Sequence, residues 1–128
     1  MLRLLLVAAG GAIGTVFRYS LSSLDYKFSN GVFPFSTLLV NLTGSFFIGF
    51  LWGLFEGLAV SPHVRMFIFI GILGGFTTFS TFSLENFNLL RAGEIKIAVS
   101  NIFIANIGGI ALVFIGFILS RCLISLFK

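Results

Sequence analysis

The residues best suited to chemistry in this chain lie together in one stretch, residues 71–83. Three glycines, five hydroxyl side chains and three phenylalanines make up most of its thirteen residues. Adjacent glycines weaken a helix, and a helix opened in lipid leaves backbone carbonyl groups without hydrogen-bond partners. Such an opening is tolerated where protein, water or an ion satisfies those groups, and interrupted helices in transporters mark ion sites. The stretch therefore predicts an ion-binding interruption of a membrane helix, although its small residues would also suit simple close packing of helices.

A second polar feature is a stripe of three side chains spaced by four residues: Thr37, Asn41 and Ser45. Residues four apart lie on one face of a helix. Asn41 would lie about two turns inside an apolar span, where an amide without a partner is costly. Two interpretations stay open. Either the Asn41 amide hydrogen-bonds a neighbouring helix, or its N–H donors face a permeant species.

Aromatic side chains are interleaved with the hydroxyls of the first stretch. Phe76, Phe79 and Phe82 are spaced by three, so they share one face of any helical portion. A stripe of this kind is often packed or faces lipid. The edge of an aromatic ring nevertheless carries partial positive charge, so an anion can meet ring edges where a cation would prefer ring faces.

Two charged residues are expected on the same side of the membrane, Arg18 late in the first apolar segment and Glu85 after the phenylalanines. Arg18 suits either of two roles. It can be an interfacial arginine whose side chain reaches the headgroups, or a cation at a water-filled entrance that draws anions inward. We expect Arg18 and Glu85 to lie close or to pair.

The composition shows what kind of elements must position these residues. Apolar residues are 58% of the chain and charged residues 9%. A soluble core of this size cannot bury so much apolar surface, so lipid must be the main solvent. Uncharged runs occur at residues 4–17, 28–55, 66–84 and 97–120. The third run has nineteen residues, which is close to the roughly 20 that cross a bilayer.

We therefore expect an all-α membrane protein, a single domain over residues 1–128 that crosses its membrane several times. The third helix is expected to be broken near residues 74–78. The opening apolar pattern continues through a full span, which argues against a cleaved signal peptide. The four predicted membrane helices cover approximately residues 4–24, 35–56, 63–91 and 95–123.

Several function classes are disfavoured by the same composition. The eight basic residues are scattered and form no phosphate-binding stripe, so we expect no nucleic-acid partner. Cys122 is the only cysteine and His63 the only histidine, which leaves neither a disulfide nor a side-chain metal cluster. No serine or cysteine has a base and an orienting partner at a suitable spacing, so we do not expect an enzyme.

Basic residues are divided evenly between the two expected sides of the membrane. One side carries Arg3, Arg65, Arg121 and Lys128, and the other carries Arg18, Lys27, Arg91 and Lys96. The positive-inside rule acts through an imbalance of such residues, and four against four leaves none. A chain without bias can insert both ways up, so an antiparallel homodimer becomes accessible.

Three motifs in this order give the chain a resemblance to a known family. They are Gly10-Gly11-x-x-Gly14-x-x-x-Arg18-Tyr19, Thr37-Leu38-Leu39-Val40-Asn41-Leu42 and Gly74-Gly75-Phe76-Thr77-Thr78-Phe79-Ser80-Thr81-Phe82-Ser83-x-Glu85. At these intervals and in a chain of this length, they resemble the bacterial Fluc (CrcB) fluoride channels. The likeness covers essentially the whole chain. Residues 74–85 are its most specific part, and the first and last helices match more loosely.

The resemblance implies four helices per subunit, with the third broken at mid-membrane, in an antiparallel dual-topology homodimer. It also implies two fluoride pathways, each lined by both subunits. Carried over by position, Asn41 is the pore asparagine and Phe79 and Phe82 lie along the fluoride path. Ser80 and Thr81 are then among the nearby hydroxyls. On the fourth helix the match is too weak to carry any pore residue over.

The resemblance further implies that Gly74 and Thr77 supply backbone carbonyls to a central structural Na⁺, which is not transported. Arg18 corresponds to the vestibule arginine. The implied function is passive, fluoride-specific efflux through the cell membrane, which lowers cytoplasmic fluoride and gives fluoride resistance. The implied partners are the fluoride ion, membrane lipid and a second copy of the chain. No nucleotide-binding loop or aspartyl-phosphate motif that would power a pump is found.

Two rival interpretations stand beside this one. A small proton-coupled multidrug exporter can also be a four-helix dual-topology dimer, but it needs a carboxylate deep in the membrane. The first span has no acid, and Glu56, Glu85 and Glu94 fall near span ends. A non-conducting subunit of a larger complex is the other rival, and it predicts that the purified chain gives no ion flux.

Overall fold

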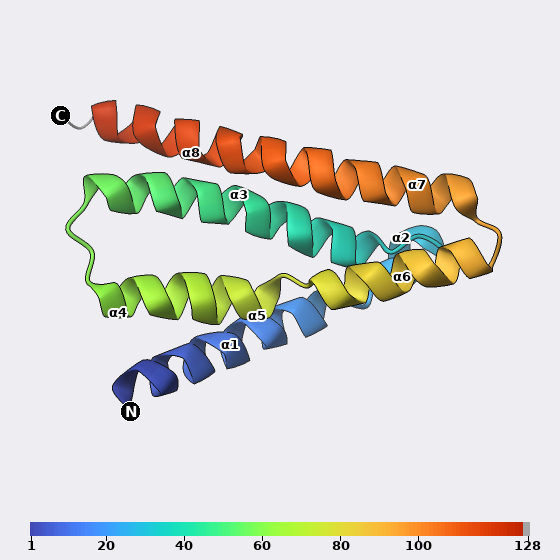
Figure 1. The fold of residues 1–128 in the computed structure, drawn as a ribbon, viewed down its shortest axis with the longest axis horizontal. Helices are drawn as coiled ribbons and strands as arrows, with labels where there is room; N and C mark the ends of the chain where they lie inside the picture. The colour runs from blue at the N-terminus through green and yellow to red at the C-terminus, as the bar shows by residue number, and fades with distance from the viewer. Residues whose placement is uncertain (127–128) are drawn as a thin grey trace.

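The chain folds into helices that run back and forth along one direction (Figure 1). The computed structural model describes residues 1–126, apart from the side chains of Tyr26 and Ser29, and no strand occurs in that range. Lys128, counted above among the basic residues, lies outside the described part. The elements are α1 (Leu2–Leu21), α2 (Leu24–Ser29), α3 (Phe35–Gly57), α4 (Pro62–Arg65), the π-helical η1 (Met66–Leu73), α5 (Gly74–Phe76), α6 (Phe79–Arg91), α7 (Ile95–Phe103), the π-helical η2 (Ile104–Gly108) and α8 (Gly109–Leu126).

Four of the helical segments are long and apolar enough to cross a membrane, which confirms the predicted number of spans. They are Leu2–Leu21, Phe35–Gly57, Pro62–Arg91 and Ile95–Leu126, close to the predicted bounds. Successive spans alternate in direction. The start of α1, the connection from α3 to α4 and the last turn of α8 lie at one end of the molecule, on the left of Figure 1. α2 and the connection from α6 to α7 lie at the other end.

The spans pack mainly in two pairs, α1 against η1 and α5, and α3 against α8. Glycines on the facing surfaces of these helices allow the close approach. A methyl group at Gly14 in α1 would overlap the carbonyl oxygen of Ile72 in η1, and one at Gly49 in α3 would overlap that of Val113 in α8. Backbones that touch in this way gain van der Waals contact, which drives helix association in lipid.

The segment between the first and second spans contains a short helix, α2, which the sequence pattern did not indicate. Asn30 ends it in the left-handed conformation at φ 51°, a position that asparagine tolerates. The carboxylate of Asp25 in α2 accepts hydrogen bonds from the backbone N–H and the hydroxyl of Ser36. Since Pro34 at the start of α3 has no side-chain acceptor, α2 supplies the cap that α3 lacks.

Few large apolar side chains are buried, although the sequence is so apolar. The buried apolar residues are Leu38, Val40, Phe55, Leu73, Phe82, Leu89 and the small Ala98. Most large apolar side chains of the four spans are exposed instead, which is what a soluble protein cannot tolerate over so large an area. Lipid or another protein surface must cover them.

Candidate functional site

The third span changes conformation between α5 and α6. α5 ends at Phe76 and α6 begins at Phe79, and the backbone of Thr77 and Thr78 between them is extended, with ψ of 156° and 125°. The Thr78 hydroxyl accepts a hydrogen bond from the N–H of Thr81 at 3.3 Å, so Thr78 caps α6. A two-residue interruption therefore lies inside the stretch rich in glycine and hydroxyl groups.

Asn41 of α3 holds this interruption with two hydrogen bonds. Its Nδ2 donates to the carbonyl oxygen of Thr78 at 3.0 Å, and its Oδ1 accepts from the N–H of Thr78 at 2.9 Å. The amide thus bonds a neighbouring helix, the first of the two interpretations left open for it. An asparagine Nδ2 carries two N–H donors, and the pair with Thr78 uses one of them.

Gly74 and Thr77 lose the backbone donors that a continuous α-helix would give their carbonyl groups. In such a helix the N–H of Thr78 would bond the carbonyl of Gly74, and that of Thr81 the carbonyl of Thr77. Here these N–H groups donate to Asn41 Oδ1 and Thr78 Oγ1 instead. Both residues line a cavity of about 300 Å³. Carbonyls of an unwound segment are the oxygens that hold Na⁺ in membrane proteins, so the two residues fit a sodium ion.

Asn41, Gly74, Thr77, Thr78 and Phe79 all line this cavity, which we call the central cavity. Ser45 and Ile48 extend it along α3, and Phe69 and Leu73 along η1. The structure therefore brings together residues from the second and third spans that lie far apart in the sequence.

The predicted pathway residues differ in their placement. The Phe79 side chain is 77% exposed and lines the central cavity, whereas Phe82 is buried at 8%. The two rings lie 5.8 Å apart between centroids at an angle of 40°. Ser80 is exposed and borders neither the central cavity nor the one described next.

A second cavity of about 310 Å³, here called the vestibule cavity, lies beside the first and contains the predicted vestibule arginine. Arg18 lines it with Thr81, Thr78, Thr37 and Glu85. Arg18 and Glu85 thus share a cavity, as expected, but no hydrogen bond or ion pair joins them within residues 1–126. Glu85 Oε1 accepts from the Thr37 hydroxyl at 2.6 Å instead.

Thr78 is the residue that reasoning from the sequence missed. It lines both cavities, pairs with Asn41 and caps α6. The signal for a cap was present, because a threonine directly before a helical run is a favoured N-cap. The stripe of Thr37, Asn41 and Ser45 was identified correctly as one face, and the structure divides it between the two cavities.

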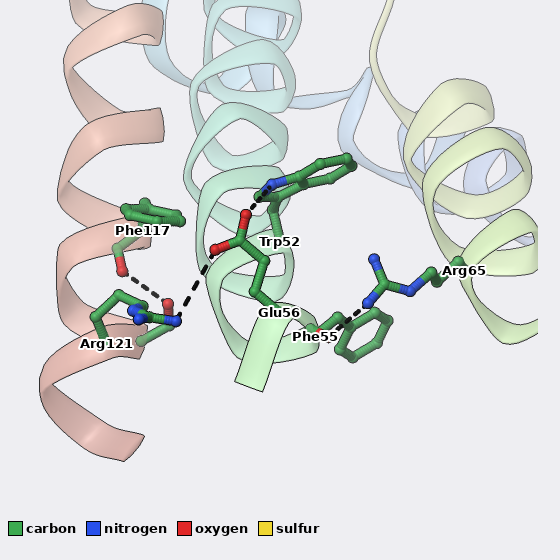
Figure 2. Close-up of polar contacts among 7 residues, drawn as sticks. Trp52, Phe55, Glu56, Arg65, Phe117 and Arg121 are labelled. Atoms are coloured by element: carbon green, nitrogen blue, oxygen red, sulfur yellow. Dashed lines mark hydrogen bonds and ion pairs between the residues drawn. The ribbon is translucent and has the colours of Figure 1, made fainter. Parts of the chain in front are cut away.

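Polar contacts at the opposite end of the bundle tie α3 to its neighbours (Figure 2). The Trp52 indole N–H donates to Glu56 at 2.9 Å, and Arg121 of α8 lies 3.9 Å from the same carboxylate. Arg65 of α4 donates to the carbonyl of Phe55 near the end of α3. Both members of the Glu56–Arg121 pair are about half exposed, so the pair contributes little stability.

Fold and site together define a class: a small multi-pass membrane protein with polar cavities at an interruption of its third span. In a bacterium its membrane is the plasma membrane. The family model described as "CrcB-like protein, Camphor Resistance (CrcB)" matches residues 5–117, and the chain belongs to this family of ion channels rather than to a family of enzymes.

Three relatives show how closely the family members agree, and each is named "Fluoride-specific ion channel FluC". The protein from Parabacteroides distasonis is 42% identical over 128 residues, all of both chains. That from Aquifex aeolicus is 47% identical, over 91% of this chain and 95% of its own. That from Pyrococcus furiosus is 49% identical, over 91% of this chain and 94% of its own.

Proposed function

We propose that this chain is a fluoride-specific ion channel through which fluoride leaves the cell passively. The observation that carries the proposal is the near full-length identity of 42–49% to relatives that bear this name. The two cavities support it, because Asn41 lines one and Arg18 the other, and an anion pathway needs hydrogen-bond donors and a cation of this kind.

Fluoride is a small, strongly hydrated anion and a strong hydrogen-bond acceptor, so its lost water must be replaced by donors. The N–H of Asn41 that Thr78 does not use is one such donor, and the hydroxyls of Ser80 and Thr81 are others. The edges of the Phe79 and Phe82 rings add partial positive charge. These contacts must be favourable enough to admit the ion and weak enough to release it.

Arg18 acts at the entrance in this proposal. A cation in a polar cavity raises the local concentration of anions and speeds their association. Its Nε is buried and has no hydrogen-bond partner among the described residues, which leaves a donor for an anion or for the water that accompanies it.

The proposed sodium site uses the carbonyl groups of Gly74 and Thr77. Two carbonyls from one protomer make an incomplete shell, and a second copy of the chain would add the same two. Bound Na⁺ would supply a fixed positive charge that lowers the free energy of an anion in a low-dielectric surrounding. In this role the cation is structural and is not itself transported.

The second copy is proposed to lie antiparallel to the first, with the interruption of the third span at mid-membrane. An even division of basic residues permits both orientations of the chain. A two-fold axis in the membrane plane would then pass near the interruption, as between inverted repeats. Phe79, 77% exposed in one protomer, would be covered by the partner.

The proposed role in the cell is fluoride resistance. Hydrogen fluoride is a weak acid that crosses membranes, dissociates in a less acidic cytoplasm and is trapped there as fluoride. A passive channel lets the ion leave down its electrochemical gradient and so lowers its cytoplasmic concentration.

Efflux from proteoliposomes tests the proposal. Vesicles that contain the purified chain and are loaded with fluoride should release it when charge movement is permitted, and vesicles loaded with chloride should stay tight. Removal of Na⁺ should reduce the fluoride efflux. Vesicles that retain fluoride would contradict the channel, and equal release of both anions would contradict its specificity.

A further inference from the structure

Two buried asparagines connect the third span to the fourth behind the proposed pathway. Asn86 of α6 and Asn101 of α7 are 5% and 1% exposed. The Asn86 Nδ2 donates to the carbonyl oxygen of Phe82 at 2.7 Å. The Asn101 Nδ2 donates to Asn86 Oδ1 at 3.1 Å. A chain of hydrogen bonds therefore leads from the backbone of Phe82 to the fourth span.

The first of these bonds determines the orientation of both amides. Because the Phe82 carbonyl is an acceptor, Asn86 must turn its NH₂ toward it and its oxygen toward Asn101. Asn101 must then turn its own NH₂ toward Asn86. Its Oδ1 is left without a partner in the described part of the chain. Asn101 is already 1% exposed in a single protomer, so a second copy cannot supply the missing donor.

A polar pair with an unsatisfied oxygen does not serve stability. A buried acceptor without a donor is destabilising, and a half-satisfied polar network is worse than an apolar core. Replacing both partners of such a pair by apolar side chains of similar shape can be nearly neutral or stabilising. Buried asparagines in coiled coils are known instead to set the register of one helix against another.

We propose that Asn86 and Asn101 are positioning residues that fix α6 against α7 and thereby hold Phe82 in place for fluoride. The proposal rests on the proposed channel function. Phe82 is buried, its carbonyl receives the Asn86 amide, and its ring lies 5.8 Å from that of Phe79. A sliding of α6 along α7 would move this ring pair relative to Asn41.

The test uses Asn101→Leu, the double variant Asn86→Leu with Asn101→Leu, and the control Asn106→Leu. Asn106 is exposed, lies in η2 of the same span as Asn101 and donates to the carbonyl of Ile102 in its own span. Melting temperature, fluoride efflux and the fluoride-to-chloride ratio are measured for each. A 4-fluorophenylalanine in place of Phe82 reports the ring position by ¹⁹F NMR in native and double-variant backgrounds.

We expect Asn101→Leu to lower the melting temperature, because Asn86 Oδ1 loses its donor. The double variant should regain the native melting temperature or exceed it. Its fluoride efflux should still be about tenfold or more below native, since small misplacements of a positioned group have effects of that size. Its ¹⁹F resonance should shift or split, and the control should match the native protein in all readouts.

A double variant with native efflux, native selectivity and an unchanged ¹⁹F resonance would overturn the inference. So would a double variant that melts well below the native protein, because the pair would then be an ordinary stabilising contact. If the native chain conducts no fluoride, the channel proposal fails by itself. The ¹⁹F resonance and the melting temperatures still decide whether the pair positions Phe82.

Discussion

The amide of Asn41 makes the same two hydrogen bonds to Thr78 that a neighbouring backbone would make. This pairing satisfies both backbone polar groups of Thr78, so the third span can be extended there without leaving them unpaired in lipid. The sequence indicated Asn41 as a polar residue deep in a span. It did not distinguish a bond to another helix from a contact with an ion, since spacing along one helix carries no information about the next.

Phe82→Ile tests the aromatic path at the scale of one side chain. Aromatic edge contacts are worth about 0.5–1.5 kcal/mol beyond their buried area, so fluoride efflux should fall by about two- to tenfold. The proposed dimer should persist on size-exclusion chromatography. The matched control is Phe87→Ile on the same helix, where the ring is 54% exposed. Near-native efflux from Phe82→Ile would contradict an aromatic-lined path.

Thr77→Val separates the side chain of the proposed sodium ligand from its carbonyl group. The Thr77 hydroxyl donates to the carbonyl of Leu73 at 2.9 Å, so it is used within its own span. Valine keeps the shape and the backbone carbonyl, and Na⁺ should therefore still be required for efflux. Sodium dependence is measured by titration of Na⁺ in the vesicle assay. Loss of that dependence would assign the hydroxyl, rather than the carbonyl, to the cation.

At the scale of the elements, the four spans could be predicted because long uncharged runs are a strong signal. α2 could not be predicted, since six residues held partly by Asp25 and Ser36 show no periodicity. The sequence also did not predict which spans pack against each other. Small residues at every fourth position predict that a helix packs closely, but they do not name its partner. The π-helical turns of η1 and η2 had no signal that we recognised.

Gly14→Ala tests the contact between α1 and the third span. The added methyl group would overlap the carbonyl of Ile72, and the helices must separate. Such overpacking typically costs about 1–3 kcal/mol, which unfolding in mixed detergent can measure. Gly11→Ala is the control, because a methyl group there meets nothing within 4 Å. Equal stability of the two variants would show that α1 packs differently.

At the scale of the whole molecule, the even charge distribution predicts that the chain inserts in both orientations. The native Cys122 reports this directly, since it is the only cysteine and lies exposed near the end of α8. In intact cells a membrane-impermeant maleimide should label about half of the thiols, because nothing biases the orientation. Permeabilised cells give the total. Labelling of all or none of the thiols would mean one fixed topology.

The whole-molecule arrangement was the part least accessible from residue patterns alone. Charge counting showed that an antiparallel pair is permitted, and the resemblance to fluoride channels supplied the rest of that expectation. The exposed Phe79 and the open central cavity are features expected of a surface that the proposed second copy would cover. Neither feature has a counterpart in the sequence, because both depend on how α3 and η1 lie relative to each other.

The pairing of Asn41 with Thr78 also bears on how the protein is made. Residue 41 leaves the ribosome long before residue 78, so the second span can already be in the bilayer when the third emerges. The extended segment of the third span then enters the bilayer when Asn41, its hydrogen-bond partner, is already there. If the chain were synthesised in the reverse order, the backbone groups of the extended segment would have no hydrogen-bond partner until the second span was made.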